Sequence, residues 1–246
     1  MTSLSINLNK LALLRNSRGR DYPNVVAYAQ KFASLGVNGI TIHPRQDERH
    51  ATRQDAYDLG MLCAKMPEIE FNIEGYPSED FLEMVEKVCP DQCTLVPDDV
   101  NQLTSDHGWD IASSIDILRP VLKRLSAAGI RSSLFVDPHP EMAEQASAAG
   151  ADRIELYTEE YANTFDTQSG DEVLEHYRKT ALRAQELGVG VNAGHDLDLQ
   201  NLGQFLEIEN ILEVSIGHAL TIECIDQGIE SVVGQYMDIC HKSYLV

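Results

Sequence analysis

Short apolar segments alternate with amphipathic stretches along the whole chain. Between the apolar segments, hydrophobic residues recur at helical spacing, and three of these stretches end at Gly36, Gly129 and Gly188. Glycine at such a position can adopt the left-handed conformation that caps a helix. Alternating strand and helix patterns predict a parallel sheet covered by helices. The eight apolar segments are residues 4–8, 39–42, 69–73, 93–96, 132–136, 153–157, 189–191 and 212–216.

The number and spacing of these segments favour a closed barrel. The chain has 246 residues, close to the ~250 typical of a (β/α)₈ barrel, and its repeating unit is about 31 residues long. A doubly wound open sheet is the competing fold, but it would concentrate polar residues at one switch point. Here polar residues follow nearly every apolar segment. We therefore predict an α/β TIM barrel with extra short helices, forming a single domain over residues 1–246.

The near-continuous apolar character of the segments is what a sheet covered by helices would show. Net charge is −20 and the isoelectric point is about 4.6, which disfavours nucleic acid and anionic membranes as partners. Five cysteines form no regular framework, and no export signal precedes them, so we expect free thiols in the cytoplasm. Cys89 and Cys93 are expected to be buried thiols rather than half of a metal site.

Polar side chains gather directly after the predicted strands. In a barrel, the loops at these strand ends form the active site. Because residues two apart on a strand share a face, Asn7 with Asn9, and Asn72 with Glu74, could point into the barrel. Histidines and carboxyls converging there would support acid–base chemistry near neutral pH. The strand-end residues are Asn7, Asn9, Lys10, His43, Arg45, His50, Asn72, Glu74, Glu155, Asn192, His195, Gly217 and His218.

Four arginines near the first two strand ends, Arg15, Arg18, Arg45 and Arg49, are suited to phosphate oxygens. Gly217 opens the last helical stretch, and a helix N-terminus after strand eight is a common phosphate site in barrels. Simpler roles remain open for some residues: Arg49 could pair with Asp47 or Glu48, and Asp137 could cap the following helix.

A metal site is less favoured than acid–base use, because the Glu-x-x-His and His-x-His spacings of metal ligands are absent. The remaining histidines lie away from these strand ends and are expected on the surface. They are His107, His139, His176 and His241.

Seven short sequence segments follow one another along the chain: NLNKLALLRNSRG, GITIHPRQDERH, FNIEG, CTLVPD with Leu103-Thr104 following, RIELYT, VNAGHDL and SIGHAL. Together they resemble the pyridoxine 5′-phosphate synthase family of the deoxyxylulose-phosphate-dependent vitamin B6 pathway. The resemblance covers nearly the whole chain. It implies a ring-closing condensation of 3-amino-2-oxopropyl phosphate with 1-deoxy-D-xylulose 5-phosphate, without metal or organic cofactor. It also implies a homo-oligomer, an octamer by family resemblance.

The resemblance carries roles to matching positions. It implies that His43 and Glu74 accept protons, His195 donates one, and Glu155 stabilises a transition state. It implies that the aminoketone phosphate is held by Asn7, Arg18, Asp196, Gly217 and His218. It implies that the deoxyxylulose phosphate is held by Asn9, Lys10, Arg45, His50 and Thr104. The loop from Pro97 to Trp109 would close over both substrates and exclude water from imine intermediates.

The chain departs from the family pattern at two places. Asn9-Lys10 replaces the Asp-His of many members, and Asp196 replaces a glycine. Two other functions therefore stay open. Another phosphosugar barrel enzyme, such as an aldolase, would need a Schiff-base lysine, for which Lys10 is the strand-end candidate. A non-catalytic phosphometabolite-binding relative would tolerate the change at Asn9-Lys10.

Overall fold

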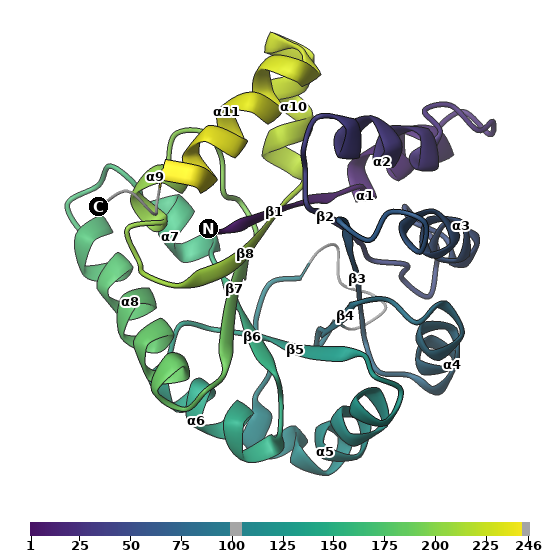
Figure 1. Ribbon diagram of the computed structural model, residues 1–246. Coiled ribbons are helices and arrows are strands. Elements are labelled where there is room, and N and C mark those ends of the chain that lie inside the picture. Colours follow the sequence, from purple (N-terminus) through teal and green to yellow (C-terminus); the bar gives the residue numbers. More distant parts are fainter. Residues whose placement is uncertain (99–104, 243–246) are drawn as a thin grey trace.

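Eight parallel strands close into a barrel in sequence order, as Figure 1 shows from one end. The computed structural model describes residues 1–98 and 105–242. The predicted barrel is confirmed, and the open sheet considered beside it is wrong. The strands are β1 Ser3–Asn7, β2 Gly39–Ile42, β3 Glu70–Gly75, β4 Gln92–Leu95, β5 Arg131–Val136, β6 Arg153–Tyr157, β7 Gly190–Gly194 and β8 Ile211–Ile216.

Helices form an outer ring around the barrel (Figure 1). Gly36, Gly129 and Gly188, which follow α2, α5 and α8, all have positive φ angles, as their positions predict. The predicted extra helices are present: α1, α7 and α10 each directly precede a longer helix, while α9 is a single turn. The helices are α1 Asn9–Asn16, α2 Val25–Ser34, α3 Arg53–Cys63, α4 Glu79–Val88, α5 Ile111–Ala127, α6 Pro140–Ala149, α7 Glu159–Thr164, α8 Gly170–Glu186, α9 Leu202–Phe205, α10 His218–Gln227 and α11 Ile229–Lys242.

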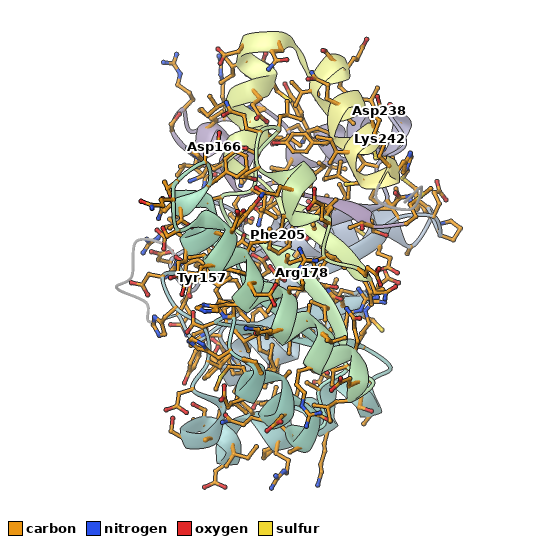
Figure 2. The ribbon with its side chains drawn as sticks, turned by 90° about the vertical axis from the view of Figure 1, so that its left-hand side faces the viewer. Tyr157, Asp166, Arg178, Phe205, Asp238 and Lys242 are labelled. Atoms are coloured by element: carbon orange, nitrogen blue, oxygen red, sulfur yellow. The ribbon has the colours of Figure 1, made fainter. Side chains whose placement is uncertain are left out.

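The strands have two faces of opposite character. On β1, Leu4 and Ile6 join the hydrophobic core, whereas Ser5 between them hydrogen-bonds to Thr41 of β2. The strands are thus less continuously apolar than the segments suggested, but the helix-covered sheet that those segments predicted is confirmed. Apolar residues face the helices and polar residues fill the barrel, because consecutive side chains on a strand point to opposite faces. Figure 2 gives the side view, in which Phe205 lies inside the packed body of the molecule.

Pairs of polar side chains from different strands also meet inside the barrel. Asn192 of β7 donates to Gln92 of β4, at 3.2 Å. Arg153 of β6 lies 3.5 Å from the buried carboxylate of Glu213 on β8. Because buried charges are costly unless they are paired, these contacts make a polar interior compatible with stability.

Two local predictions are wrong. Cys89 is exposed, since it occupies the left-handed position that ends α4, while Cys93 is buried. Asp137 does not cap α6, which begins after His139; its carboxylate instead accepts a hydrogen bond from the backbone of Gly108. All five cysteines are free thiols, as expected. Within residues 1–98 and 105–242, no helix is both long and apolar enough to cross a membrane.

Candidate active site

The carboxyl ends of β1, β2 and β3 bring three predicted residues together. Asn7 of β1 donates a hydrogen bond to Glu74 of β3 at 3.3 Å, reaching across β2. His43 follows β2 directly and is 7% exposed. Asn72 and Glu74 both point into the barrel, which confirms the alternation argument for this strand.

Asn9 is not a strand residue, contrary to the alternation argument for β1. The strand ends at Asn7, and Asn9 is the first residue of α1. Its backbone N–H donates to the Asn7 side chain at 3.0 Å, and its own side-chain oxygen accepts from the backbone N–H of His43 at 2.9 Å. Asn9 thus holds the end of β2 in place beside Asn7. This contact needs a side-chain oxygen, which an asparagine supplies as well as an aspartate.

The two histidines of the second strand end are neutral at neutral pH. Burial, together with the charges of His50, Arg45 and Arg49, moves the pKa of His43 well below its usual range. Burial and the same two arginines lower the pKa of His50 to about 4. The two rings lie 5.9 Å apart in an edge-on arrangement. A neutral imidazole can accept a proton, so the environment suits His43 to the role of a base.

The pKa values of the two carboxyls, Glu74 and Glu155, are shifted upwards instead. Burial raises the pKa of Glu74 well above its usual range, and Glu155 and Asp98 add to the effect. Burial also raises the pKa of Glu155 to about 8, with Glu213 as the second cause. Burial therefore shifts both carboxyls towards their protonated forms. The mouth thus contains proton acceptors and proton donors at the same time.

Arg45 is paired with Asp98, the last residue of the CTLVPD segment, for which the sequence predicted no role. Its guanidinium lies 3.1 Å from the carboxylate of Asp98, and both side chains are buried. Ser105 donates to the same carboxylate at 2.9 Å. A pocket beside this pair is lined in part by His43, Tyr76 and Asp98. The pair joins the β2 loop to both ends of the β4 loop.

The β7 strand end carries strained backbone. His195 and Asp196 have φ angles of 89° and 56°, conformations that non-glycine residues adopt at a cost and that often occur at functional sites. The Asp196 carboxylate lies 3.1 Å from His195 Nδ1, and this contact lowers the pKa of Asp196. The left-handed angle explains why glycine suits this position in the family, and aspartate is among the residues that tolerate it.

Charges from two other strand ends act on the same carboxylate. His195 is the main cause of the lowered pKa of Asp196, and the charges of His218 and Lys10 lower it further. The charge of Lys10 also lowers the pKa of His50. The structure thus places Lys10 within electrostatic reach of both the β7 and the β2 strand ends. Gly217 directly precedes α10. A Cβ atom added to Gly217 would lie 3.0 Å from Cβ of Asn7. The N-terminus of α10 therefore borders the same mouth.

An apolar wall closes the opposite side. Val96, Phe135 and Tyr157, at the ends of β4, β5 and β6, form a separate cluster of buried hydrophobic residues. Tyr157 packs edge-on against His195 with ring centres 5.0 Å apart. Such a wall excludes water and orients the imidazole. It was not predicted, because each residue looks like an ordinary strand residue in the sequence.

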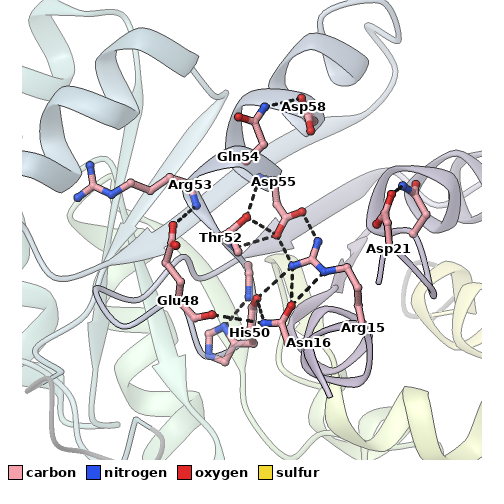
Figure 3. A network of polar contacts seen from close by, with 12 residues as sticks. Arg15, Asn16, Asp21, Glu48, His50, Thr52, Arg53, Gln54, Asp55 and Asp58 are labelled. Carbon is pink, nitrogen blue, oxygen red and sulfur yellow. Dashed lines mark hydrogen bonds and ion pairs between the residues drawn. The ribbon is translucent and has the colours of Figure 1, made fainter. Parts of the chain in front are cut away.

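Side chains of α1 hold the β2 loop through a network of polar contacts, as Figure 3 shows. Asn16 donates to the backbone carbonyls of Glu48, Arg49 and His50, the shortest contact being 2.8 Å. Arg15 forms a two-pronged ion pair with Asp55, which also makes the capping box of α3. Contrary to the prediction, Arg15 is therefore engaged by a carboxylate rather than aimed at phosphate.

Other predictions have mixed outcomes. Arg49 pairs with Asp47 at 2.6 Å, one of the two simpler roles left open. Arg18 is exposed beyond α1, and within the described part of the chain no hydrogen bond or ion pair links its side chain to another candidate residue. Thr104, and part of the loop from Pro97 to Trp109, lie outside the described residues. The described end of that loop is anchored by Trp109, whose indole donates to Leu95 at 2.9 Å.

The described residues contain no group of three or more His, Cys, Asp or Glu side chains placed to hold a metal ion. What the mouth does contain is a neutral imidazole, the buried carboxyl of Glu155, the partly buried carboxyl of Glu74, cationic side chains and a helix N-terminus. Fold and site together define a TIM-barrel enzyme equipped for acid–base chemistry. Phosphoribosyl anthranilate isomerase from Thermotoga maritima has a similar fold, with a TM-score of 0.61 at 12% identity, covering 98% of this chain and 100% of that one.

Sequence comparisons identify the family. The family described as pyridoxal phosphate biosynthesis protein PdxJ matches residues 4–242. Pyridoxine 5′-phosphate synthase of Bacteroides thetaiotaomicron is 49% identical, covering 96% of this chain and 98% of the relative. That of Brucella anthropi is 46% identical, covering 95% and 97%. The chain belongs to the PdxJ family of pyridoxal phosphate biosynthesis proteins.

Proposed function

We propose that the protein is a pyridoxine 5′-phosphate synthase. It condenses 3-amino-2-oxopropyl phosphate with 1-deoxy-D-xylulose 5-phosphate to pyridoxine 5′-phosphate, with release of phosphate and water. Full-length relatives at 46% to 50% identity support this activity. One observation within the structure carries it: the Asn7–Glu74 hydrogen bond spans the strand that ends in neutral His43. A neutral imidazole and a carboxyl with a raised pKa thus share one mouth.

The reaction moves protons at every stage, so His43 and Glu74 would have complementary roles in proton transfer. Imine formation needs a proton for the departing water, and later steps need protons removed from carbon. Neutral His43 is ready to accept a proton. Burial raises the pKa of Glu74, which would let this carboxyl donate a proton as well as accept one. A cationic amine or iminium nearby would favour its ionised form. His195, with Asp196 beside it, would donate the proton that assists phosphate departure.

Phosphate binding would divide between two sides of the mouth. The N-terminus of α10 at Gly217 and His218, with Asn7, Asp196 and Arg18, would hold the aminoketone phosphate, since a helix N-terminus favours anions. The second side would hold the deoxyxylulose phosphate through residues around the β2 loop. These are Asn9, Lys10, Arg45, His50 and Thr104. The Asp98 contact neutralises part of the Arg45 charge. Lys10 has no ion pair with the residues that the structure describes, so it would be the more available cation on this side.

We also propose a homo-octamer in the cytoplasm that needs no metal or organic cofactor. Exposed apolar side chains on two neighbouring helices support self-association. Leu13 and Leu14 on α1 and Ile222 and Ile225 on α10 are 44% to 71% exposed. Exposed apolar groups of this kind often mark protein–protein contacts. Light scattering on the purified protein measures the oligomer, and a monomeric mass would contradict it.

The activity is tested with purified protein and both substrates, after dialysis against a chelator. Expected products are pyridoxine 5′-phosphate and inorganic phosphate in equal amounts, with neither formed when one substrate is omitted. A phosphometabolite binder would bind one or both substrates and form no product. An aldolase would instead trap substrate on Lys10 upon borohydride reduction. Either result would replace the proposed function.

A further inference from the structure

Two consecutive residues at the end of β6 contact the strained backbone at the end of β7. Tyr157 packs edge-on against the His195 ring, with ring centres 5.0 Å apart. Thr158 comes next and is fully buried. Its hydroxyl donates to the backbone carbonyl of Gly194, at 2.8 Å, and to that of His195. Its backbone N–H also donates to the Gly194 carbonyl, at 3.1 Å.

The two carbonyls belong to the peptide groups on either side of the His195 Cα atom. Because peptide groups are planar, the orientations of these two groups define the φ and ψ angles of His195. One side chain that binds both carbonyls therefore fixes the backbone from which the imidazole projects. The φ angle of 89° is unfavourable for a residue with a Cβ atom, and such angles persist only where surrounding contacts impose them. Thr158 supplies contacts of this kind.

The Thr158 hydroxyl is not used for the helix that it precedes. Thr158 is the N-cap residue of α7, and a threonine at this position usually accepts a hydrogen bond from the first turn of its helix. Here the side chain makes no such cap. It reaches instead past the last residue pair of the β6–β7 ladder, Tyr157 with Gly194. The hydroxyl thus serves the β7 strand end rather than α7.

The next carbonyl along β7 is held from another element. Asn201 is 3% exposed, and its side-chain amide donates to the carbonyl of Asp196 at 3.1 Å. Its amide oxygen accepts from the backbone N–H of Asp198 at 2.9 Å, and its own carbonyl accepts from the Tyr161 hydroxyl at 2.7 Å. The successive carbonyls of residues 194, 195 and 196 are therefore each bound by a buried side chain.

We propose that Thr158 is a positioning residue for His195, and that Asn201 supports the residue that follows it. By binding the carbonyls on both sides of His195, Thr158 keeps the imidazole against Tyr157 at the barrel mouth. This placement stands on the contacts of this chain alone. Its catalytic value rests on the proposed function, in which His195 donates the proton that assists phosphate departure.

Crystal structures of two matched variants test the placement without any substrate. Thr158→Val keeps the shape and the backbone N–H but removes the hydroxyl, whereas Thr158→Ser keeps the hydroxyl. In Thr158→Val we expect the peptide group after His195 to rotate and the imidazole to leave Tyr157. In Thr158→Ser both should stay as in the parent protein. An unchanged backbone and ring of His195 in Thr158→Val would overturn the proposal.

Steady-state kinetics of the same variants measure what the placement contributes. We expect kcat of Thr158→Val to fall at least about tenfold, since a small displacement of a reacting group can cost about 10²-fold. KM for the deoxyxylulose phosphate should stay nearly constant, because the residues proposed to hold it lie around the β2 loop. Thr158→Ser should recover most of the lost kcat.

Thr180→Val is the matched control. Thr180 is also fully buried, and its hydroxyl donates to a backbone carbonyl, that of His176 within α8, at 2.9 Å. This variant should keep the parent kcat and the parent position of His195. Equal losses of kcat in Thr158→Val and Thr180→Val, or no loss in either, would overturn the positioning role. A parent protein that is inactive with both substrates would refute the proposed function instead, and the crystal structures would still decide the placement of His195.

Discussion

The two faces of the barrel strands differ in what holds them together. Outside, residues such as Ile42 and Leu134 pack against helices in a continuous apolar shell. Inside, Thr94, Asn72 and Glu155 are equally buried but meet through hydrogen bonds. Apolar packing tolerates small changes at a graded cost, whereas a buried polar group that loses its partner is penalised at once. The fold therefore depends on the outer face and the chemistry on the inner one.

The same contrast accounts for the unusual acidity of the interior. Glu74, Glu155 and Glu213 are enclosed by the barrel, and burial is the largest cause of the raised pKa of each. An exposed glutamate elsewhere on this acidic chain would simply ionise. The barrel thus creates proton donors from residues that are bases in water. Changes to the inner face should therefore alter activity and pH dependence, and changes to the shell should alter stability.

The largest effect is expected at Glu74. Replacing it with glutamine keeps the size and the contact with Asn7 but removes the titrating proton. We expect kcat to fall by about 10³-fold, since general acid–base groups contribute 10²–10⁴, while the thermal midpoint holds or rises. Steady-state kinetics and calorimetry measure the two quantities. If kcat stayed within tenfold of the parent value, Glu74 would not be the principal proton-transfer group.

A shell residue should give the reverse result. Phe205 is fully buried and packs against Tyr161 and Tyr177, with ring centres 5.2 and 5.6 Å away. Phe205→Ala should lower the free energy of unfolding by about 3 kcal/mol or more, with kcat of the folded fraction nearly unchanged. Denaturant unfolding measures the loss. Leu182→Ala, at a side chain that is 56% exposed, is the control and should change little. Equal losses in both variants would remove the distinction between shell and surface.

Phe205 and Glu74 stand for the parts of the fold and site that could be predicted from the sequence. The outer face was readable, because its apolar side chains recur along each strand and helix, and the eight segments lie within a few residues of the observed strands. Glu74 was readable too, since it follows Asn72 at strand spacing. Pairings across the barrel, such as Asp98 with Arg45 or Thr94 with Glu155, join residues 53 and 61 positions apart. No local pattern encodes such a distance.

Local errors have equally physical causes. The alternation rule failed at Asn9 because β1 ends two residues earlier and a helix begins there. Arg15 looked free to bind phosphate because nothing nearby in the sequence announces its partner Asp55, on another helix. Cys89 looked like a buried thiol, but the end of α4 places it in a left-handed, exposed position. In each case a tertiary contact or a helix boundary decided the outcome.

The pH dependence of stability offers a further test of the inner face. The pKa of Glu155 is raised from 4.5 to about 8 on folding. The folded protein therefore keeps a proton that the unfolded chain releases, so this group's contribution to stability is fully present below about pH 4.5 and declines up to about pH 8. A single such proton gives a slope near 1.4 kcal/mol per pH unit. Glu155→Gln should flatten the stability curve across that window, as measured by denaturant unfolding at several pH values.

A parallel pH dependence in the parent and in Glu155→Gln would mean that Glu155 titrates with an ordinary pKa. Glu86→Gln is the matched control, because the Glu86 carboxylate is paired with Arg124 at the surface and its pKa is lowered rather than raised. That variant should leave the window between pH 5 and 8 unaltered.

The α1 clamp should affect substrate binding more than either stability or chemistry. Asn16→Ala removes three hydrogen bonds to the backbone of the β2 loop, which carries His50. We expect KM for the deoxyxylulose phosphate to rise about tenfold, as an ordered binding loop becomes loose, with a smaller change in kcat. Asn24→Ala is the matched control. It removes the cap of α2, costing about 1 kcal/mol of stability, and should leave KM unaltered.

The smallest effect concerns an exposed glycine of α9. Gly203 lies in α9, its φ angle is not positive, and a Cβ atom there would meet nothing within 4 Å. Gly203→Ala should therefore raise the free energy of unfolding by about 0.5 kcal/mol through reduced freedom of the unfolded chain. Gly194→Ala makes the opposite case, because its Cβ would press on Glu155 and displace the carboxyl from Thr94. The same substitution should thus stabilise one variant and lower kcat in the other, and equal behaviour would contradict the division of labour between the two faces.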